Sequence, residues 1–166
     1  AKILREDTLN KPLFVDGRGK LDQFDVVLAN PPFSLKDWGS EKWAADPHKR
    51  AVGGVPPKGN GDFAWVQHMI ASMKPESGRV GVVMPHGVLF RGSSEAAIRQ
   101  HLIENDMLEA VIGLAPNLFY GTTIPACLLF FRATKDKARK KHVLFVDGSK
   151  RFTKGKNQNE LSISDV

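Results

Sequence analysis

The chain has 166 residues, of which 42% are hydrophobic and 25% are charged, and its formal net charge is +6. This length suits one hydrophobic core, and the composition excludes a chain that is disordered throughout. No apolar run approaches the roughly 18 residues of a membrane span, and no signal-peptide pattern is visible. The single cysteine, Cys127, cannot form an internal disulfide, so we expect a reducing, cytoplasmic compartment.

The predicted elements alternate between strands and helices along the chain. Residues 26–29 form an uninterrupted apolar run that Pro31 and Pro32 end, which predicts a strand buried on both faces. One helix is predicted to begin at Asp62, as its N-cap, and to stop at Lys74-Pro75. A second is capped by Ser93 or Ser94 and runs to about residue 105, and further strands are expected at 79–84, 108–113, 126–131 and 142–146.

This order predicts an α/β fold with at least one antiparallel pair among the last strands, because their connections are short. Asn30 then lies at the carboxyl end of a central strand, the edge where open α/β sheets bind ligands. The loop over 34–61 is long enough to be functional or partly disordered. Trp38 and Trp43 lie in it, and we expect them to pack against the domain, with DNA contact as the alternative.

The strongest local signal is Asn30-Pro31-Pro32-Phe33. The Asn30 side-chain carbonyl and the Pro31 backbone carbonyl are two acceptors that suit a substrate –NH₂ group, and Phe33 offers a flat face for a planar ring. Two acceptors localise the nitrogen lone pair and stabilise positive charge developing on nitrogen, which favours attack on an electrophilic methyl group. The four residues alone also fit a turn that merely ends a strand.

The strand context makes this motif resemble the catalytic motif of amino-group methyltransferases. More closely, the chain resembles the modification subunit of type I restriction–modification systems, a DNA adenine-N6 methyltransferase. The stretches that carry the resemblance are LREDTL, FDVVLANPPF, GVPPKGNGDFAWVQHMIASMKP, GRVGVVMPHGVLFRG, LFYGTTIPACLLFF and VLFVDGSKRFTKGKNQNEL. The resemblance implies a cytoplasmic enzyme that transfers methyl from S-adenosylmethionine to a flipped-out adenine, with DNA, a specificity subunit and a restriction subunit as partners.

The resemblance also implies roles for single residues. Asp7, with Thr8 beside it, falls where the family contacts the adenine moiety of the cofactor. Asp7, Thr8 and Asn30 are therefore expected to bind the cofactor. Asn30, Pro31, Pro32 and Phe33 fall on the amine-binding motif, with Phe33 stacking on the target adenine. Phe119 resembles the aromatic residue that contacts the base from the other side, with Tyr120 as its rival and a core position as the alternative for Phe119.

Other features complete the predicted site. Pro56, Pro57 and Lys58 are expected to form a lid near the base, although Lys58 also fits a plain surface position. The five histidines and one cysteine show no metal-ligand spacing, so we expect no metal. His68 falls on the predicted helix and is expected to pack rather than to catalyse.

The family's glycine-rich cofactor loop and ribose-binding acidic residue are absent from the sequence. We therefore expect an incomplete Rossmann-like methyltransferase fold, the C-terminal half of a mixed sheet with an antiparallel last strand. Residues 1–147 are expected to be the C-terminal part of the catalytic domain, and 148–166 a basic, polar tail. Such a chain on its own is expected to be inactive and prone to self-association.

Two alternatives stay open: another amino-group methyltransferase, acting on guanine N2 of rRNA or on a protein glutamine, and a non-catalytic DNA-binding or subunit-docking module. Residues 132–156 hold ten Lys or Arg residues and two Asp residues. This basic segment is expected to be either a solvated linker or a contact with DNA phosphate or an acidic partner.

Overall fold

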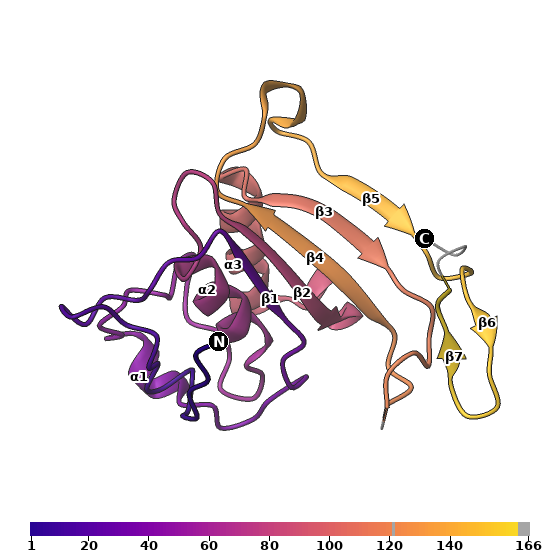
Figure 1. The fold of residues 1–166 in the computed structure, drawn as a ribbon, viewed down its shortest axis with the longest axis horizontal. Coiled ribbons are helices and arrows are strands. Elements are labelled where there is room, and N and C mark those ends of the chain that lie inside the picture. The colour runs from indigo at the N-terminus through magenta and orange to yellow at the C-terminus, as the bar shows by residue number, and fades with distance from the viewer. Residues whose placement is uncertain (121, 163–166) are drawn as a thin grey trace.

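The structure is a computed structural model that describes residues 1–120 and 122–162 (Figure 1). Its centre is a five-stranded sheet in the order β1 (Val26–Ala29), β2 (Arg79–Pro85), β4 (Ala126–Arg132), β3 (Leu108–Gly113) and β5 (Leu144–Asp147). The helices are α1 (Ser40–Trp43), α2 (Asp62–Ala71) and α3 (Ser93–Glu104), with 3-10 turns at His86–Leu89 and Lys137–Arg139. A separate hairpin pairs β6 (Thr153–Lys154) with β7 (Asn159–Glu160). The predicted alternation of strands and helices is confirmed.

The sheet is mixed, as predicted. β1 pairs with β2 in parallel, whereas β4 runs antiparallel to both of its neighbours, β2 and β3. The antiparallel strand is thus β4 and not the last strand, because β5 runs parallel to β3. The chain reverses direction between β3 and β4 and again between β4 and β5, so β5 returns to the direction of β3.

The main core lies between one face of the sheet and the helices α2 and α3. Successive side chains of a strand point to opposite faces, and on β2 the alternate residues Val80, Val82 and Met84 are all buried toward the helices. The helices contribute their periodic apolar residues, which are Phe63, Val66, Met69, Ile70, Ile98 and Leu102. This packing sets β2 against α2, and beyond the end of β1 the Ser34 N–H donates to Asp62 at the start of α2.

The prediction that residues 26–29 are buried on both faces is wrong for this structure. Val26 and Leu28 are 54% and 73% exposed, while Val27 and Ala29 pack against the core. Among the described residues β1 pairs with one strand only, and no helix covers its second face. An apolar hollow of about 450 Å³ remains there, lined partly by Leu28 and Phe130.

Both helices begin differently from the prediction. The N-cap of α2 is Gly61, and Asp62 is the first helical residue. The N-cap of α3 is Gly92, and neither helix has a side-chain hydrogen bond at its cap. The Asp62 carboxylate is instead buried and binds the Ser34 N–H and Arg91. Asp62 therefore makes tertiary contacts and does not cap its own helix. No helix among the described residues has the length and apolar character needed to cross a membrane.

Candidate functional site

Asn30, Pro31, Pro32 and Phe33 follow β1 directly, at the carboxyl edge of the sheet. Pro31 is buried, Phe33 is half-buried, and Asn30 is exposed. No hydrogen bond within the described part of the chain engages the Asn30 side chain. Because this polar side chain stands at a strand end without an internal partner, its carbonyl is free to accept a hydrogen bond from a ligand.

Two aromatic rings meet beside Asn30. Phe33 and Phe119 have ring centroids 6.5 Å apart and an interplanar angle of 74°, an edge-to-face arrangement. Phe119 comes from the connection between β3 and β4, so the fold brings together two residues that are 86 positions apart in the sequence. Its neighbour Tyr120 is 91% exposed. The geometry therefore favours Phe119 over Tyr120 as the partner of Phe33.

The turn after Phe33 is held by a buried ion-pair network. The Ser34 backbone N–H donates to Oδ1 of Asp62 at 2.7 Å, and Nη2 of Arg91 donates to Oδ2 of the same carboxylate at 2.6 Å. Asp62 is fully buried, and Arg91 also pairs with the buried Glu95. The hydrogen bond to Glu95, followed by that to Asp62, raises the pKa of Arg91. Ser34 has a φ of 51°, a conformation that a non-glycine residue keeps only when its surroundings hold it.

Asp7 organises the loop that carries Thr8. Its carboxylate accepts hydrogen bonds from the backbone N–H groups of Leu9 and Asn10 at 3.2 and 3.1 Å, and from the Asn10 side chain at 2.8 Å. The Asn10 side chain also donates to the Trp38 carbonyl at 3.1 Å. Asp7 is exposed, so its carboxylate shapes the loop while it stays open to solvent.

A second buried ion pair braces the same loop. Arg50 and Asp46 are each almost fully buried, with Nε of Arg50 2.9 Å from the carboxylate. The guanidinium donates to the carbonyls of Thr8 at 3.3 Å and Leu9 at 2.7 Å. Burial acts to raise the pKa of Asp46, but hydrogen bonds from Arg50 outweigh it and the pKa is lowered. Arg50 therefore ties the Asp7 loop to the long loop after the Asn30 motif.

Aromatic side chains surround the Asp46–Arg50 ion pair, called here the buried brace. Trp38 and Trp43 are both 2% exposed, with ring centroids 5.0 Å apart, and they bury Leu9 of the Asp7 loop. The Arg50 guanidinium lies over the Trp43 ring at 4.6 Å. The expectation that the two tryptophans pack against the domain is confirmed. The Trp38 indole N–H donates to the Pro57 carbonyl at 3.0 Å, which holds the expected lid segment 56–58 against this cluster.

His68 contacts the brace from α2. Its Nδ1 lies 3.1 Å from Nη1 of Arg50, and burial together with the nearby Arg50 charge lowers its pKa to about 4. A neutral ring nitrogen is thus an acceptor for the guanidinium at neutral pH. This arrangement agrees with the packing role that the sequence predicts for His68.

Residues 1–166 match the N-6 DNA methylase family. The chain belongs to that family. It is 37% identical over 142 residues to the type I restriction enzyme HindI methylase subunit of Haemophilus influenzae, covering 85% of this chain and 30% of that one. It is 35% identical over 144 residues to the MjaIX methylase subunit of Methanocaldococcus jannaschii, covering 84% and 26%.

A solved structure shows the same fold. The methyltransferase subunit of a type I restriction-modification system from Streptococcus thermophilus superposes with a TM-score of 0.85 at 37% identity, over 95% of this chain and 32% of that chain. This match confirms the expected methyltransferase fold. The chain spans about a third or less of the length of these N-6 DNA methylase relatives.

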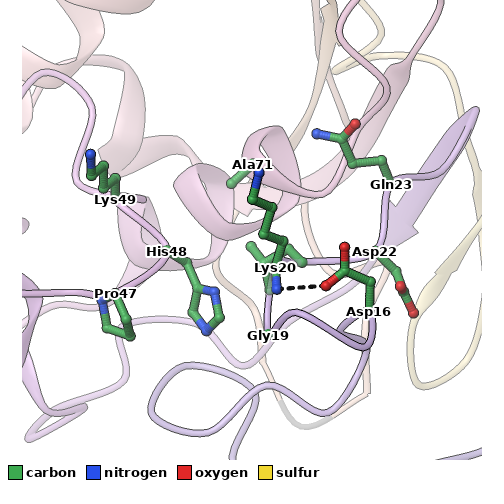
Figure 2. Close-up of a pocket in the computed structure, with 10 residues that line it drawn as sticks. Asp16, Gly19, Lys20, Asp22, Gln23, Pro47, His48, Lys49 and Ala71 are labelled. Atoms are coloured by element: carbon green, nitrogen blue, oxygen red, sulfur yellow. Dashed lines mark hydrogen bonds between the residues drawn. The ribbon is translucent and has the colours of Figure 1, made fainter.

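A hollow of about 720 Å³ in this N-6 DNA methylase chain is lined by other residues than the Asn30 motif, Phe119 and Asp7 (Figure 2). Its walls include Gln23, which precedes β1, whereas Asn30 follows β1. Figure 2 shows the backbone hydrogen bond from Lys20 to the Asp16 carboxylate, at 3.0 Å, within this wall. The hollow contains none of the predicted site residues, so the motif and not cavity size locates the candidate site.

The sequence patterns did not indicate a role for Asp46, Arg50, Arg91 or Glu95, and they assigned Asp62 only to a helix cap. Their signal is weak, because an Asp and an Arg four residues apart, as at Asp46 and Arg50, are common on helical surfaces. Only burial separates these pairs from ordinary surface charges. Hydrogen bonds connect Asp7 to the loop after Phe33 through Asn10 and Trp38, and among the described residues no hydrogen bond joins Asp7 to Asn30.

Proposed function

We propose that this protein is the DNA adenine-N6 methyltransferase subunit of a type I restriction–modification system. The observation that carries the proposal is the free Asn30 amide at the end of β1, beside the Phe33–Phe119 pair. Membership in the N-6 DNA methylase family supports it, as do relatives that are methylase subunits. The partners proposed are DNA and the specificity and restriction subunits.

The residues suit the amine that such a reaction uses. The Asn30 side-chain carbonyl and the Pro31 backbone carbonyl accept the two N6 hydrogens of adenine, and Phe33 and Phe119 contact its ring. Methyl transfer from S-adenosylmethionine would develop positive charge on N6, and the two carbonyl dipoles would stabilise it. N6 would then release one proton to water, which leaves N6-methyladenine.

The cofactor side of the proposal rests on Asp7. S-adenosylmethionine supplies an electrophilic methyl group when it is bound. The Asp7 carboxylate is exposed, and Oδ2 accepts only one of the bonds that shape its loop, so this oxygen fits an acceptor for the cofactor's amino group. Arg50 holds this loop from behind through the carbonyls of Thr8 and Leu9.

The test is a labelled methyl-transfer assay with the natural full-length protein and its specificity subunit. Unmethylated DNA, RNA and protein extracts serve as parallel acceptors. The proposal predicts label in DNA alone, recovered as N6-methyladenine after digestion. Label in RNA as N2-methylguanine, or in a protein glutamine, would assign the site to another amino-group methyltransferase, and DNA binding without transfer would assign a non-catalytic module.

A further inference from the structure

The basic segment over 132–156 divides into two parts in the structure. In the first part, three of the six cations pair with acidic neighbours. Arg132 and Arg139 both pair with Glu109, at 3.3 and 3.0 Å, and Lys135 pairs with Asp106 at 2.7 Å while it is only 4% exposed. These charges are neutralised by neighbours within the domain, so they are poorly placed to attract a polyanion.

The second part is the β6–β7 hairpin, taken here as residues 150–160. It carries Lys150, Arg151, Lys154 and Lys156, all of them exposed, and its first acidic residue is Glu160 at the far end. No ion pair in the described part of the chain engages these four cations. The hairpin is therefore a positively charged surface whose cations form no ion pair within the described part of the chain.

Neutral amide groups attach the hairpin to the fold. The Asn159 backbone N–H donates to the Asn117 carbonyl at 2.8 Å, and the Asn159 side chain donates to the Pro116 carbonyl at 2.8 Å. The Asn117 side chain donates to the Asn157 carbonyl at 3.3 Å. Because the anchoring is done by asparagines and backbone groups, the lysines and the arginine stay available for another partner.

This attachment places the hairpin beside the candidate base site. Asn117 lies two residues before Phe119, whose ring faces Phe33. Figure 1 shows the hairpin beyond the carboxyl ends of β3 and β5, the same edge of the sheet at which β1 leads into Asn30. The connection that carries Phe119 thus joins the aromatic pair to the positive hairpin.

We propose that the β6–β7 hairpin binds DNA phosphates next to the flipped base. This inference rests on the function proposed above. A DNA strand carries one phosphate charge about every 3.4 Å, so the four exposed cations of the hairpin are enough to neutralise several consecutive phosphates. Such contacts hold the backbone while Phe33 and Phe119 receive the base, and they offset part of the cost of unstacking it.

A docking surface for another subunit fits the hairpin less well. The cores of protein–protein interfaces are depleted in lysine, whereas interfaces with DNA are strongly positive. Between residues 150 and 160 the one large apolar side chain is Phe152, and it is already half-buried in this chain. The composition and exposure of the hairpin therefore favour phosphate over an apolar protein surface.

The experiment measures DNA binding by the natural full-length protein with its specificity subunit over about 50–200 mM salt. The test variant combines Lys154→Gln and Lys156→Gln. The matched control combines Lys137→Gln and Lys140→Gln, which removes the same charge from the exposed 3-10 turn that Figure 1 places at the opposite end of the sheet. Each phosphate contact contributes close to one unit to the slope of log K against log salt.

The proposal predicts that the test variant lowers the magnitude of this slope by about 2 and weakens binding about tenfold, while the control keeps the wild-type slope and activity. A test variant with the wild-type slope would overturn the inference, and so would a variant that instead loses its specificity subunit during copurification. If the wild-type protein methylates no DNA, the proposed function fails first; if it does and the slope is unchanged, only the inference about the hairpin fails.

Discussion

The two sides of the candidate site differ in how their polar groups are used. On the open side, the Asn30 side chain is exposed and has no partner in the described part of the chain. On the buried side, Asp46 pairs with Arg50 and Asp62 with Arg91, and both carboxylates are buried. The side chain proposed to bind the substrate amine is left free, and each of the two carboxylates behind it is paired with an arginine.

The buried ion pairs make the side behind the site rigid. A buried charge is tolerated only when it is paired and hydrogen-bonded, so each pair adopts one geometry. One carboxylate oxygen of Asp62 binds the Ser34 N–H, and Arg50 binds the carbonyls of Thr8 and Leu9. The loops that carry the residues proposed to contact the target base and the cofactor are therefore positioned from behind, and the proposed methyl transfer to a weak nucleophile requires such preorganisation.

The largest expected effect comes from breaking the buried brace. Arg50→Ala leaves Asp46 charged and without its partner, so we expect unfolding stability to fall by about 3–5 kcal/mol. Urea unfolding followed by tryptophan fluorescence measures this, because Trp38 and Trp43 lie in the same cluster. The control, Lys58→Ala, removes an exposed ion pair with Asp37 and is expected to change stability by less than about 0.5 kcal/mol. Equal losses in the two variants would contradict the comparison.

The next effect separates positioning from stability. Asp62→Asn keeps an oxygen for the Ser34 N–H but turns an amide toward Arg91, so the turn after Phe33 shifts. We expect methyl transfer to slow about 10–100-fold while DNA affinity is kept. Glu95→Gln is the matched control, since it disturbs the same partly exposed arginine, Arg91, and has no hydrogen bond to Ser34. If both variants slow transfer equally, Asp62 contributes only to folding.

Acidification is expected to weaken the buried side first. The pKa of His68 is lowered from 6.5 to about 4, so between these values the unfolded chain binds more protons than the folded chain. Stability therefore falls as the pH drops from 7 to 5, by about 1–2 kcal/mol. The pKa of Asp46 is lowered, which keeps its pair with Arg50 charged over this range. Unfolding at both pH values measures the loss, which His68→Gln should reduce and the exposed-site control His142→Gln should not.

The smallest expected effect tests the aromatic pair on the open side. Phe119→Leu keeps an apolar side chain but removes the ring that meets Phe33, and we expect base capture to weaken about fivefold, near the low end of a stacking contribution. Fluorescence of 2-aminopurine at the target position reports the flipped base. Tyr120→Leu, which changes a 91% exposed neighbour, is the control and should leave the signal unchanged. A larger effect from Tyr120 than from Phe119 would reverse their assignment.

The sequence predicted the features that depend on local pattern. Runs of apolar residues located β1 to β4 closely, and the proline pair located the end of β1. The strand predicted at 142–146 is displaced, since β5 is Leu144–Asp147. The burial of β1 was wrong because an apolar run reports hydrophobicity and not the number of neighbouring strands.

The supporting network could not be predicted in the same way. The bond between Ser34 and Asp62 joins residues 28 positions apart, and that between Arg50 and Leu9 joins residues 41 apart. No periodicity links such partners, and Asp62 satisfied a simpler pattern as a helix cap. The sequence also could not show which cations of the basic segment are paired. Arg132 and Lys135 pair with Glu109 and Asp106, which lie in β3 and just before it and are distant in the sequence.

The central claim is that Asn30 accepts a hydrogen bond from the substrate amine during methyl transfer. Single-turnover transfer to DNA, with DNA affinity measured in parallel, tests it in the natural full-length protein carrying Asn30→Ala or Asn30→Asp. The account predicts that Asn30→Ala slows transfer by about 10²–10³-fold with DNA binding intact, and that Asn30→Asp, which retains an acceptor, is faster than Asn30→Ala. Transfer by Asn30→Ala at the wild-type rate would contradict the account.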